Sequence, residues 1–300
     1  MTTSASAPGG FAPAQLDRLL RQACAMAGLD PRDACLLRGH TNAVFRLAHD
    51  PVVLKIARNG SSPAHAQRTV DFVAWLMDNS FPTTLLHPVQ QPLLLDGHAA
   101  TLWRYLPQPP HPVTAAQLAK PLHALHTLPR PPIALPDHDN LRAIRRSIDS
   151  ITCLPPHTLT YLSERADELE ADLARVDFAL PPGVIQGDPQ HRNALYTEDG
   201  EVVLCDWDTV AFGQPEWDLV TVEVHCRRFG HGQAHYTAFA DTYGWDITRW
   251  PGYPTLAAVR ELRMITTNAR KVPSAPHTYD EIRRRIEGLQ RDPHLRWNIL

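Results

Sequence analysis

The chain has 300 residues, of which 43% are hydrophobic and 20% charged, and its formal net charge is −3. This length allows two compact lobes, and the near-neutral charge argues against nucleic acid as a partner. No apolar run approaches the roughly eighteen residues of a membrane helix, so we expect no membrane partner. Residues 1–10 read as a disordered leader rather than a signal peptide. The five cysteines are scattered and odd in number. Such a pattern favours neither a zinc knuckle nor a disulfide framework and fits a cytoplasmic location.

The first part of the chain mixes strand and helix patterns. Apolar spacing predicts a helix, two strand regions, a helix and two further strands, in the order 13–29, 36–48, 52–57, 63–77, 93–95 and 99–106. Asp96 and Gly97 predict a tight turn between the last two strands. Four prolines follow between positions 107 and 112. We place a domain boundary there, which predicts a first domain over 1–106 and a second over 107–300.

Helical spacing dominates beyond the prolines. Helices are predicted at 114–127, 140–151 and 159–176, short strands at 184–185 and 202–205, and mostly helix from residue 215 onward. The fold class is therefore α+β. Strands and one main helix are expected in the first domain, and a small β insertion among helices in the second.

Three polar residues near the two short strands suggest chemistry. Asp188 is followed five residues later by Asn193, and Asp206 ends the next apolar strand. Phosphoryl transfer needs one carboxylate to accept the acceptor's proton. It also needs an amide oxygen and a second carboxylate to hold the metal ion beside the phosphates. This pattern predicts those roles for Asp188, Asn193 and Asp206. The alternative is a β-hairpin with acidic ends.

Lys55 is one of only three lysines in an arginine-rich chain, and it lies inside an apolar strand. A compact point charge on a core strand predicts a contact with the phosphates of a nucleotide. The alternative is an edge-strand lysine that points to water. Kinase-like sites pair such a lysine with a helix carboxylate, yet the first glutamate of this chain is Glu164. Asp71, on the second predicted helix, is therefore the expected partner of Lys55.

Two blocks resemble the aminoglycoside phosphotransferase family. Residues 185–195 (IQGDPQHRNAL) resemble its catalytic loop, and residues 204–208 (LCDWD) with 213–219 (GQPEWDL) resemble its metal-binding segment. The resemblance implies a two-lobed protein-kinase-like fold, with an N-terminal antiparallel sheet plus helix and a mostly helical C-terminal lobe. It further implies that Asp188 is the catalytic base and that Asn193 and Asp206 hold Mg²⁺. Asp218 would then support the loop.

Two positions in these blocks differ from the usual family pattern. Gln186 stands where a histidine is usual, and its amide can also form hydrogen bonds. Asp208 stands where many members have a smaller or uncharged residue. It would be either an outer-shell partner of the metal or a solvated charge.

Two further segments resemble parts of the nucleotide site. Residues 38–45 (RGHTNAVF) resemble the family's degenerate phosphate-covering turn, which implies contacts near Thr41 and Asn42. Trp103 and Tyr105 precede the prolines in what resembles the connector that meets the base, although ordinary core packing is an alternative for both rings.

Two histidines raise the question of a zinc site. His123 and His126 stand three apart on a predicted helix, without a third ligand at a usual zinc spacing. The segment that contains His126 also resembles a structural helix of the family.

The predicted activity is that of an enzyme, a phosphotransferase with an alcohol group as acceptor, dependent on ATP or GTP and on Mg²⁺. The resemblance implies an antibiotic acceptor, of aminoglycoside or basic peptide type. Residues 107–300 hold 20 basic and 25 acidic residues, which suits a cationic acceptor. The alternatives are a metabolic small-molecule kinase, of choline, sugar or homoserine type, and a nucleotide-binding pseudokinase scaffold.

Overall fold

The computed structural model describes residues 10–39, 42–292 and 294–300. The chain forms two compact units. Unit 1 comprises Met1–Pro112, Pro131–Leu135 and Ala194–Val210, and unit 2 comprises Val113–Arg130, Pro136–Asn193 and Ala211–Leu300. The first passage between the units, after Pro112, lies close to the predicted boundary. The later return of the chain to unit 1 at Ala194 has no signal in the sequence pattern.

Unit 1 is built on a five-stranded antiparallel sheet in the order β1-β2-β3-β5-β4. Its elements are α1 (Pro13–Ala27), β1 (Cys35–Arg38), β2 (Ala43–Arg46), β3 (Val52–Ile56), α2 (Pro63–Asp78), β4 (Leu93–Leu95), β5 (His98–Arg104), β7 (Ala194–Tyr196), β8 (Val202–Leu204) and the 3-10 helix η3 (Trp207–Thr209). The predicted N-terminal antiparallel sheet with helix is confirmed.

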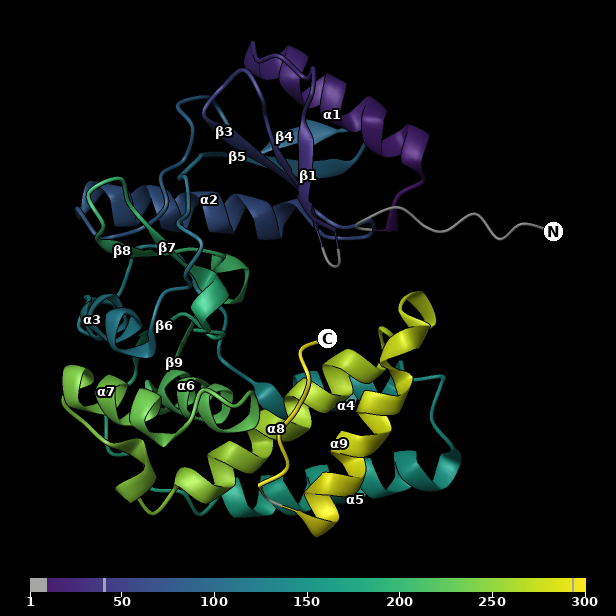
Figure 1. The fold of residues 1–300 in the computed structure, drawn as a ribbon, viewed down its shortest axis with the longest axis vertical. Coiled ribbons are helices and arrows are strands. Elements are labelled where there is room, and N and C mark those ends of the chain that lie inside the picture. The colour runs from purple at the N-terminus through teal and green to yellow at the C-terminus, as the bar shows by residue number, and fades with distance from the viewer. Residues whose placement is uncertain (1–9, 40–41, 293) are drawn as a thin grey trace. The chain divides into compact units, whose positions relative to one another are not determined.

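Helix α1 covers one face of this sheet, and α2 lies on the other (Figure 1). A proline opens α1, and Gly28 ends it with a left-handed backbone (φ 70°) that glycine adopts without steric cost. Apolar residues of α1 pack with Val52, Leu54 and Ile56 of β3 in one buried cluster. Because side chains alternate along a strand, Lys55 points to the face away from α1.

A buried tryptophan anchors the segment after β8. Trp207 is 1% exposed, and its indole N–H donates a hydrogen bond of 2.8 Å to the Thr83 hydroxyl. Its ring lies 5.3 Å from that of Phe72 on α2, at an edge-to-face angle of 65°. The position of the neighbouring Asp206 is therefore tied to the core of unit 1.

We expect Trp207→Ala to lower the free energy of unfolding by about 3–5 kcal/mol, because it empties a large, fully packed site. Trp207→Phe keeps an aromatic ring and removes only the indole donor, so a smaller loss of about 1–2 kcal/mol is expected. Denaturant unfolding followed by circular dichroism measures both. Equal stability of the alanine variant and the wild type would contradict the anchoring role.

Unit 2 is mostly helical, as predicted. Its elements are α3 (Ala115–His126), α4 (Asn140–Asp149), α5 (Pro156–Leu173), β6 (Gly183–Ile185), η2 (His191–Asn193), β9 (Ala211–Gly213), α6 (Glu216–Arg228), α7 (Gln233–Tyr243), η4 (Ile247–Arg249), α8 (Tyr253–Ala269), η5 (Val272–Ser274), η6 (Pro276–Thr278) and α9 (Tyr279–Arg291). Helix α3 packs on α7, and α8 packs on α4, α5, α6 and α9. Across the described ranges, no helix combines the length and the apolar character that crossing a membrane requires.

The two short strands that flank the predicted catalytic loop have different partners. β6, before the loop, pairs antiparallel with β9 in unit 2, whereas β8 pairs antiparallel with β7 in unit 1. The catalytic loop thus leaves a small sheet of unit 2, and Asp206 follows a hairpin of unit 1.

Candidate active site

Lys55 is the centre of a charged cluster in unit 1. Its ammonium lies 2.8 Å from Asp206 Oδ1 and 2.7 Å from Asp208 Oδ2. Burial alone would lower the pKa of Lys55, but the two carboxylates together raise it above its ordinary value, so the ammonium stays charged. β3 lies between β2 and β5, and the Lys55 side chain is 16% exposed. The alternative of an edge-strand lysine that points to water is therefore wrong.

The expected ion pair between Lys55 and Asp71 is not formed. Asp71 lies on an exposed position of α2, where its Oδ1 accepts a hydrogen bond of 2.8 Å from the Gln67 side chain. The carboxylates that contact Lys55 are those of Asp206 and Asp208. Asp71 lies on the predicted helix, but it is on the face of α2 that is exposed to solvent.

Asp206 and Asp208 are positioned by local geometry. Asp206 adopts a left-handed backbone (φ 58°, ψ 64°), which aspartate tolerates better than most residues. Burial alone would raise the pKa of Asp208, but the Lys55 ammonium lowers it below its usual value. The Asn42 amide also donates a hydrogen bond of 3.0 Å to Asp208 Oδ2. Asp208 is thus a partner of the lysine in this structure, a role not considered for it from the sequence.

Asn42 joins the predicted turn to this cluster. Its Oδ1 accepts a hydrogen bond of 3.0 Å from the backbone N–H of Arg58, while its amide nitrogen binds Asp208. Thr41, the other residue predicted in this turn, lies outside the described residues. Asn42 and Lys55 therefore both contact the carboxylate of Asp208.

The roles of the two carboxylates can be separated by mutation. Asp71→Ala should change the KM for nucleotide by less than about twofold, as for an ordinary surface substitution. Asp208→Asn removes a charge-assisted contact to Lys55, so we expect kcat/KM for nucleotide to fall by about tenfold. Steady-state kinetics at varied nucleotide concentration compares the two variants. A larger effect at Asp71 than at Asp208 would restore the pairing expected from the sequence.

Trp103 and Tyr105 are both half-buried in unit 1. The Trp103 indole donates to the Thr101 hydroxyl at 2.9 Å. The Arg46 guanidinium lies 4.5 Å from the centre of the Tyr105 ring. Both rings thus make contacts within the sheet region, as core packing requires. Contact with a nucleotide base remains a prediction for these two residues.

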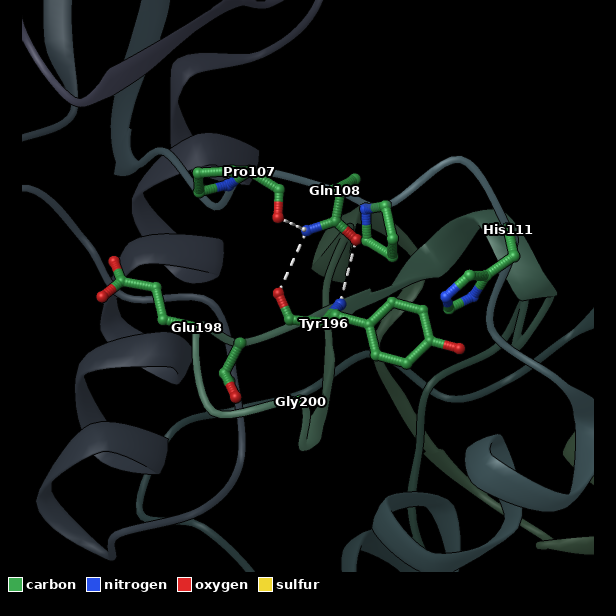
Figure 2. A pocket seen from close by; sticks show the side chains of 8 residues that line it. Pro107, Gln108, His111, Tyr196, Glu198 and Gly200 are labelled. Atoms are coloured by element: carbon green, nitrogen blue, oxygen red, sulfur yellow. Dashed lines mark hydrogen bonds between the residues drawn. The ribbon is translucent and has the colours of Figure 1, made fainter.

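A pocket borders the proline-rich segment that follows β5 (Figure 2). Gln108 joins this segment to β7, because its amide donates to the Tyr196 carbonyl at 3.0 Å and accepts from the Tyr196 N–H at 2.9 Å. Prolines, a glycine and the side chains of His111 and Glu198 complete much of the lining. None of the predicted catalytic or metal-binding residues lines this pocket, and we assign it no role in catalysis.

In unit 2, the Asp188 carboxylate has two side-chain donors. Arg260 Nη2 on α8 lies 2.5 Å from Oδ1, and Gln190 Nε2 lies 2.7 Å from Oδ2. The Asn193 amide nitrogen donates to the Asp188 carbonyl at 2.9 Å, which leaves its Oδ1 outside that bond. The loop therefore presents a fixed carboxylate, as a general base requires. Arg260 and Gln190 were not predicted from the sequence.

Asp218 of α6 holds the start of the loop through two hydrogen bonds from backbone N–H groups. Its Oδ2 accepts from the Gln186 N–H at 2.7 Å, and its Oδ1 accepts from the Gly187 N–H at 2.9 Å. Gln186 in turn accepts from the Asp188 N–H at 2.7 Å through its side-chain oxygen. These contacts agree with the supporting role that the resemblance implies for Asp218. They also show that the Gln186 amide braces the loop at the position where histidine is usual.

His126 has a structural role in the same region. Its Nε2 lies 3.1 Å from Asp218 Oδ2, and its Nδ1 lies 2.7 Å from the Tyr243 hydroxyl. His123, one helical turn away, is exposed. Both ring nitrogens of His126 are thus engaged, which fits the structural helix rather than a zinc site.

Two arginines of α8, Arg260 and Arg263, bring positive charge near Asp188. The pKa of Arg263 is lowered to about 10, because burial and the charges of Arg260 and Arg270 outweigh the opposing charge of Asp188. Burial also lowers the pKa of His138 to about 4, and Arg260 and Arg263 contribute in the same direction. The surroundings of Asp188 are therefore more positively charged than the net negative charge of residues 107–300 suggests.

The donors predicted for a metal ion are chemically suitable. Asn193 offers an amide oxygen and Asp206 a carboxylate whose side chain is 40% exposed. Hard oxygen donors of this kind suit Mg²⁺ better than thiols or imidazoles do. The residues present therefore fit the ion that the predicted reaction needs.

Comparison with known proteins identifies the family. A family model described as the phosphotransferase enzyme family matches residues 35–258. No curated protein matches the sequence.

Several solved structures share the fold. The choline kinase LicA from Streptococcus pneumoniae is 12% identical with a TM-score of 0.65, over 91% of this chain and 99% of that one. An amicoumacin kinase in complex with AMP-PNP, Ca²⁺ and Ami is 15% identical with a TM-score of 0.66, over 93% and 94% of the two chains. A spectinomycin phosphotransferase with ADP and spectinomycin is 14% identical with a TM-score of 0.65, over 92% and 94%. At these identities the likeness concerns the fold.

Proposed function

Because the chain belongs to the phosphotransferase enzyme family, whose kinase-like members phosphorylate hydroxyl groups of small molecules, we propose that it transfers the terminal phosphoryl group of ATP or GTP with Asp188 as the general base. The observation that carries this proposal is the fixed carboxylate of Asp188, held by Arg260 and Gln190 on a loop that Asp218 braces. Such a group accepts the proton of the acceptor hydroxyl as the oxygen attacks phosphorus.

Lys55 binds the nucleotide phosphates in this scheme. Its ammonium stays charged beside Asp206 and Asp208, and its place on a central strand restricts its motion. Asn193 and Asp206 would hold Mg²⁺ through their oxygens, and the bound ion would supply positive charge that neutralises the phosphates. Asn42, which reaches Lys55 through Asp208, supports the same cluster.

The acceptor proposed first is an antibiotic. The solved structures with the same fold include an amicoumacin kinase and a spectinomycin phosphotransferase, next to a choline kinase. A polycation, such as an aminoglycoside, would meet the positive charges of Arg260 and Arg263 near the base. We therefore propose an antibiotic whose reactive hydroxyl lies away from its cationic groups.

The arginines favour a second candidate, a metabolite that carries an anionic group close to its hydroxyl. A carboxylate on the acceptor would be attracted by Arg263, while Arg260 stays paired with Asp188. A homoserine-type acceptor has this chemistry, whereas choline does not. Such an anionic acceptor differs from the cationic one that the acidic excess of residues 107–300 suggests.

A panel of acceptors tests these proposals. The full chain is incubated with ATP or GTP and Mg²⁺, and with antibiotics, choline, sugars or homoserine, and the products are analysed by mass spectrometry. The expected result is the gain of one phosphoryl group by an acceptor with wild-type protein and not with Asp188→Asn. Nucleotide binding without transfer to any acceptor would instead support a pseudokinase scaffold.

A further inference from the structure

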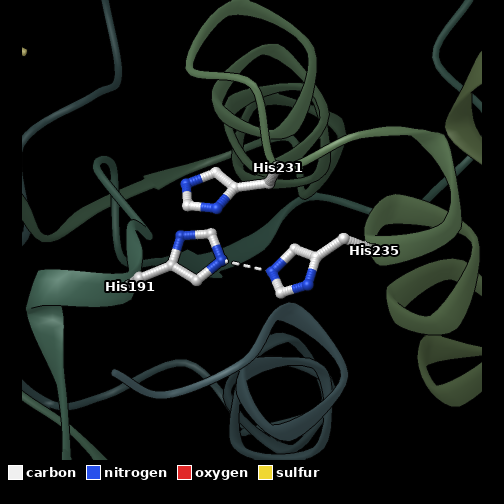
Figure 3. A group of neighbouring side chains, drawn as sticks. All are labelled: His191, His231 and His235. Carbon is white, nitrogen blue, oxygen red and sulfur yellow. Dashed lines mark hydrogen bonds between the residues drawn. The ribbon is translucent and has the colours of Figure 1, made fainter. Parts of the chain in front are cut away.

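Three histidines form a cluster next to the catalytic loop (Figure 3). His191 belongs to η2 in the loop, His231 lies two residues before the start of α7, and His235 lies in the first turn of α7. His191 Nε2 is 2.9 Å from His235 Nε2. The ring centres are 4.6 to 5.2 Å apart in the three pairs, and one ring nitrogen from each residue lies within 4.8 Å of the others. All three residues lie in unit 2.

The local backbone explains why the rings meet. His231 and His235 are separated by three residues, a spacing that is common between two zinc-binding histidines. Gly232 between them has a positive φ of 89°, which a residue with a Cβ rarely adopts. The chain can therefore turn into α7 with both imidazoles on the side of His191.

Hydrogen bonds define the orientation of His235. Its Nε2 accepts a hydrogen bond of 3.1 Å from the backbone N–H of Ala115. Because a backbone N–H can only donate, this nitrogen carries a lone pair, and the proton of the neutral ring is on Nδ1. The same lone pair faces His191 Nε2, so a cation placed between the two rings would take the place of a proton on His191 Nε2 and would also displace the N–H of Ala115.

The chemistry of the cluster suits a transition metal. Within the described ranges, the histidines that form ion pairs with carboxylates are His49 and His126. No carboxylate of these ranges therefore forms an ion pair with the three clustered histidines. Imidazole nitrogens bind zinc, copper and nickel well, whereas Mg²⁺ prefers oxygen.

We propose that His191, His231 and His235 form a site for one divalent transition-metal ion of the zinc type, with a fourth position open to water. Two nitrogens bound to tetrahedral zinc at about 2.0–2.1 Å are about 3.3 Å apart, close to the observed separation of the His191–His235 pair. His231 is exposed, so rotation of its side chain can complete the set. The bound ion ties the catalytic loop to α7. This role is separate from that of the phosphate-bound metal.

Zinc binding to the full chain tests the site. The protein is prepared without a histidine tag, stripped with a chelator and titrated with Zn²⁺ by calorimetry in the absence of nucleotide and acceptor. We expect one tightly bound ion per chain. Since loss of an outer-shell partner alone costs about 10–100-fold in affinity, His231→Gln and His191→Asn should each weaken binding at least about tenfold.

Matched controls separate this site from others. His123→Gln changes an exposed histidine of α3 outside the cluster, and Cys35→Ser removes an exposed thiol. Both should bind Zn²⁺ as the wild type does. His235 also holds the N-terminus of α3, so the decisive variants are those at His231 and His191, with circular dichroism to confirm that they fold.

A spectroscopic measurement complements the titration. Co²⁺ in place of Zn²⁺ should give visible absorption bands of a four-coordinate site in the wild type, and weak bands in His231→Gln. Absence of stoichiometric binding, or equal Zn²⁺ affinity in the wild type and His231→Gln, would overturn the proposal. Because no phosphoryl transfer is measured, this outcome is independent of the proposed function.

Discussion

Asp188→Asn is expected to reduce turnover by about 10²–10⁴-fold, the usual contribution of a positioned acid–base group. The substitution keeps the size of the side chain and an oxygen that can accept from Arg260, but it removes the basic carboxylate that now lies 2.5 Å from that guanidinium. The charged cluster around Lys55, which is the proposed nucleotide site, is composed of other residues. Nucleotide affinity should therefore change little. Single-turnover kinetics with an identified acceptor, combined with calorimetric nucleotide binding, measures both quantities.

The control for this variant concerns Arg260. Removing the Asp188 charge leaves a largely buried guanidinium with a weaker partner, which costs stability. The thermal midpoint of Asp188→Asn should thus be compared with that of Arg260→Gln, which leaves the Asp188 carboxylate in place. If Asp188→Asn retained near wild-type turnover while folded, Asp188 would not be the base. A loss of turnover explained by unfolding would appear in both variants as a lower midpoint.

Lys55→Ala should lower kcat/KM for nucleotide by about 10²–10³-fold, the typical cost of removing one preorganised electrostatic contact in an active site. The reason is that Lys55 carries the positive charge of the cluster, and its removal leaves Asp206 and Asp208 without their common cation. These carboxylates would then repel the nucleotide phosphates. The effect should exceed that of Asp208→Asn, which keeps the ammonium.

Lys120→Ala is the matched control, because Lys120 is an exposed lysine on α3. Its kcat/KM should remain within about twofold of the wild type. Lys55→Arg keeps the positive charge but replaces a compact ammonium with a planar, bulkier group, so only partial activity is expected. Similar kinetics in Lys55→Ala and Lys120→Ala would show that Lys55 does not contact the nucleotide.

Much of the fold could be predicted from the sequence because the pattern of apolar residues in helices and strands repeats every two to four positions. The helix over 13–29 and the hairpin around Asp96 appear in the structure as α1 and as β4 with β5. These elements depend on apolar spacing and on turn residues within a few positions of one another. The return of the chain to unit 1 at Ala194 depends instead on contacts between distant segments. No local pattern marks it.

The difference between local patterns and distant contacts also applies to the candidate site. Asp188, Asn193, Asp206 and Lys55 could each be selected from the sequence, because a local strand or loop pattern surrounds every one of them. The partners of these residues could not. Lys55 contacts Asp206 across 151 positions and Asp188 contacts Arg260 across 72, and neither separation has a sequence signature.

The wrong prediction for Asp71 shows that sequence patterns do not identify which side chains form ion pairs. Charge and helix position singled it out, but which face of α2 turns toward Lys55 is decided by packing of that helix in unit 1. The sequence by itself thus determined the fold class, the family and the chemical groups of the predicted reaction. Only the tertiary structure decided which charges meet, because side chains far apart in the sequence are brought together by core packing that no local period encodes.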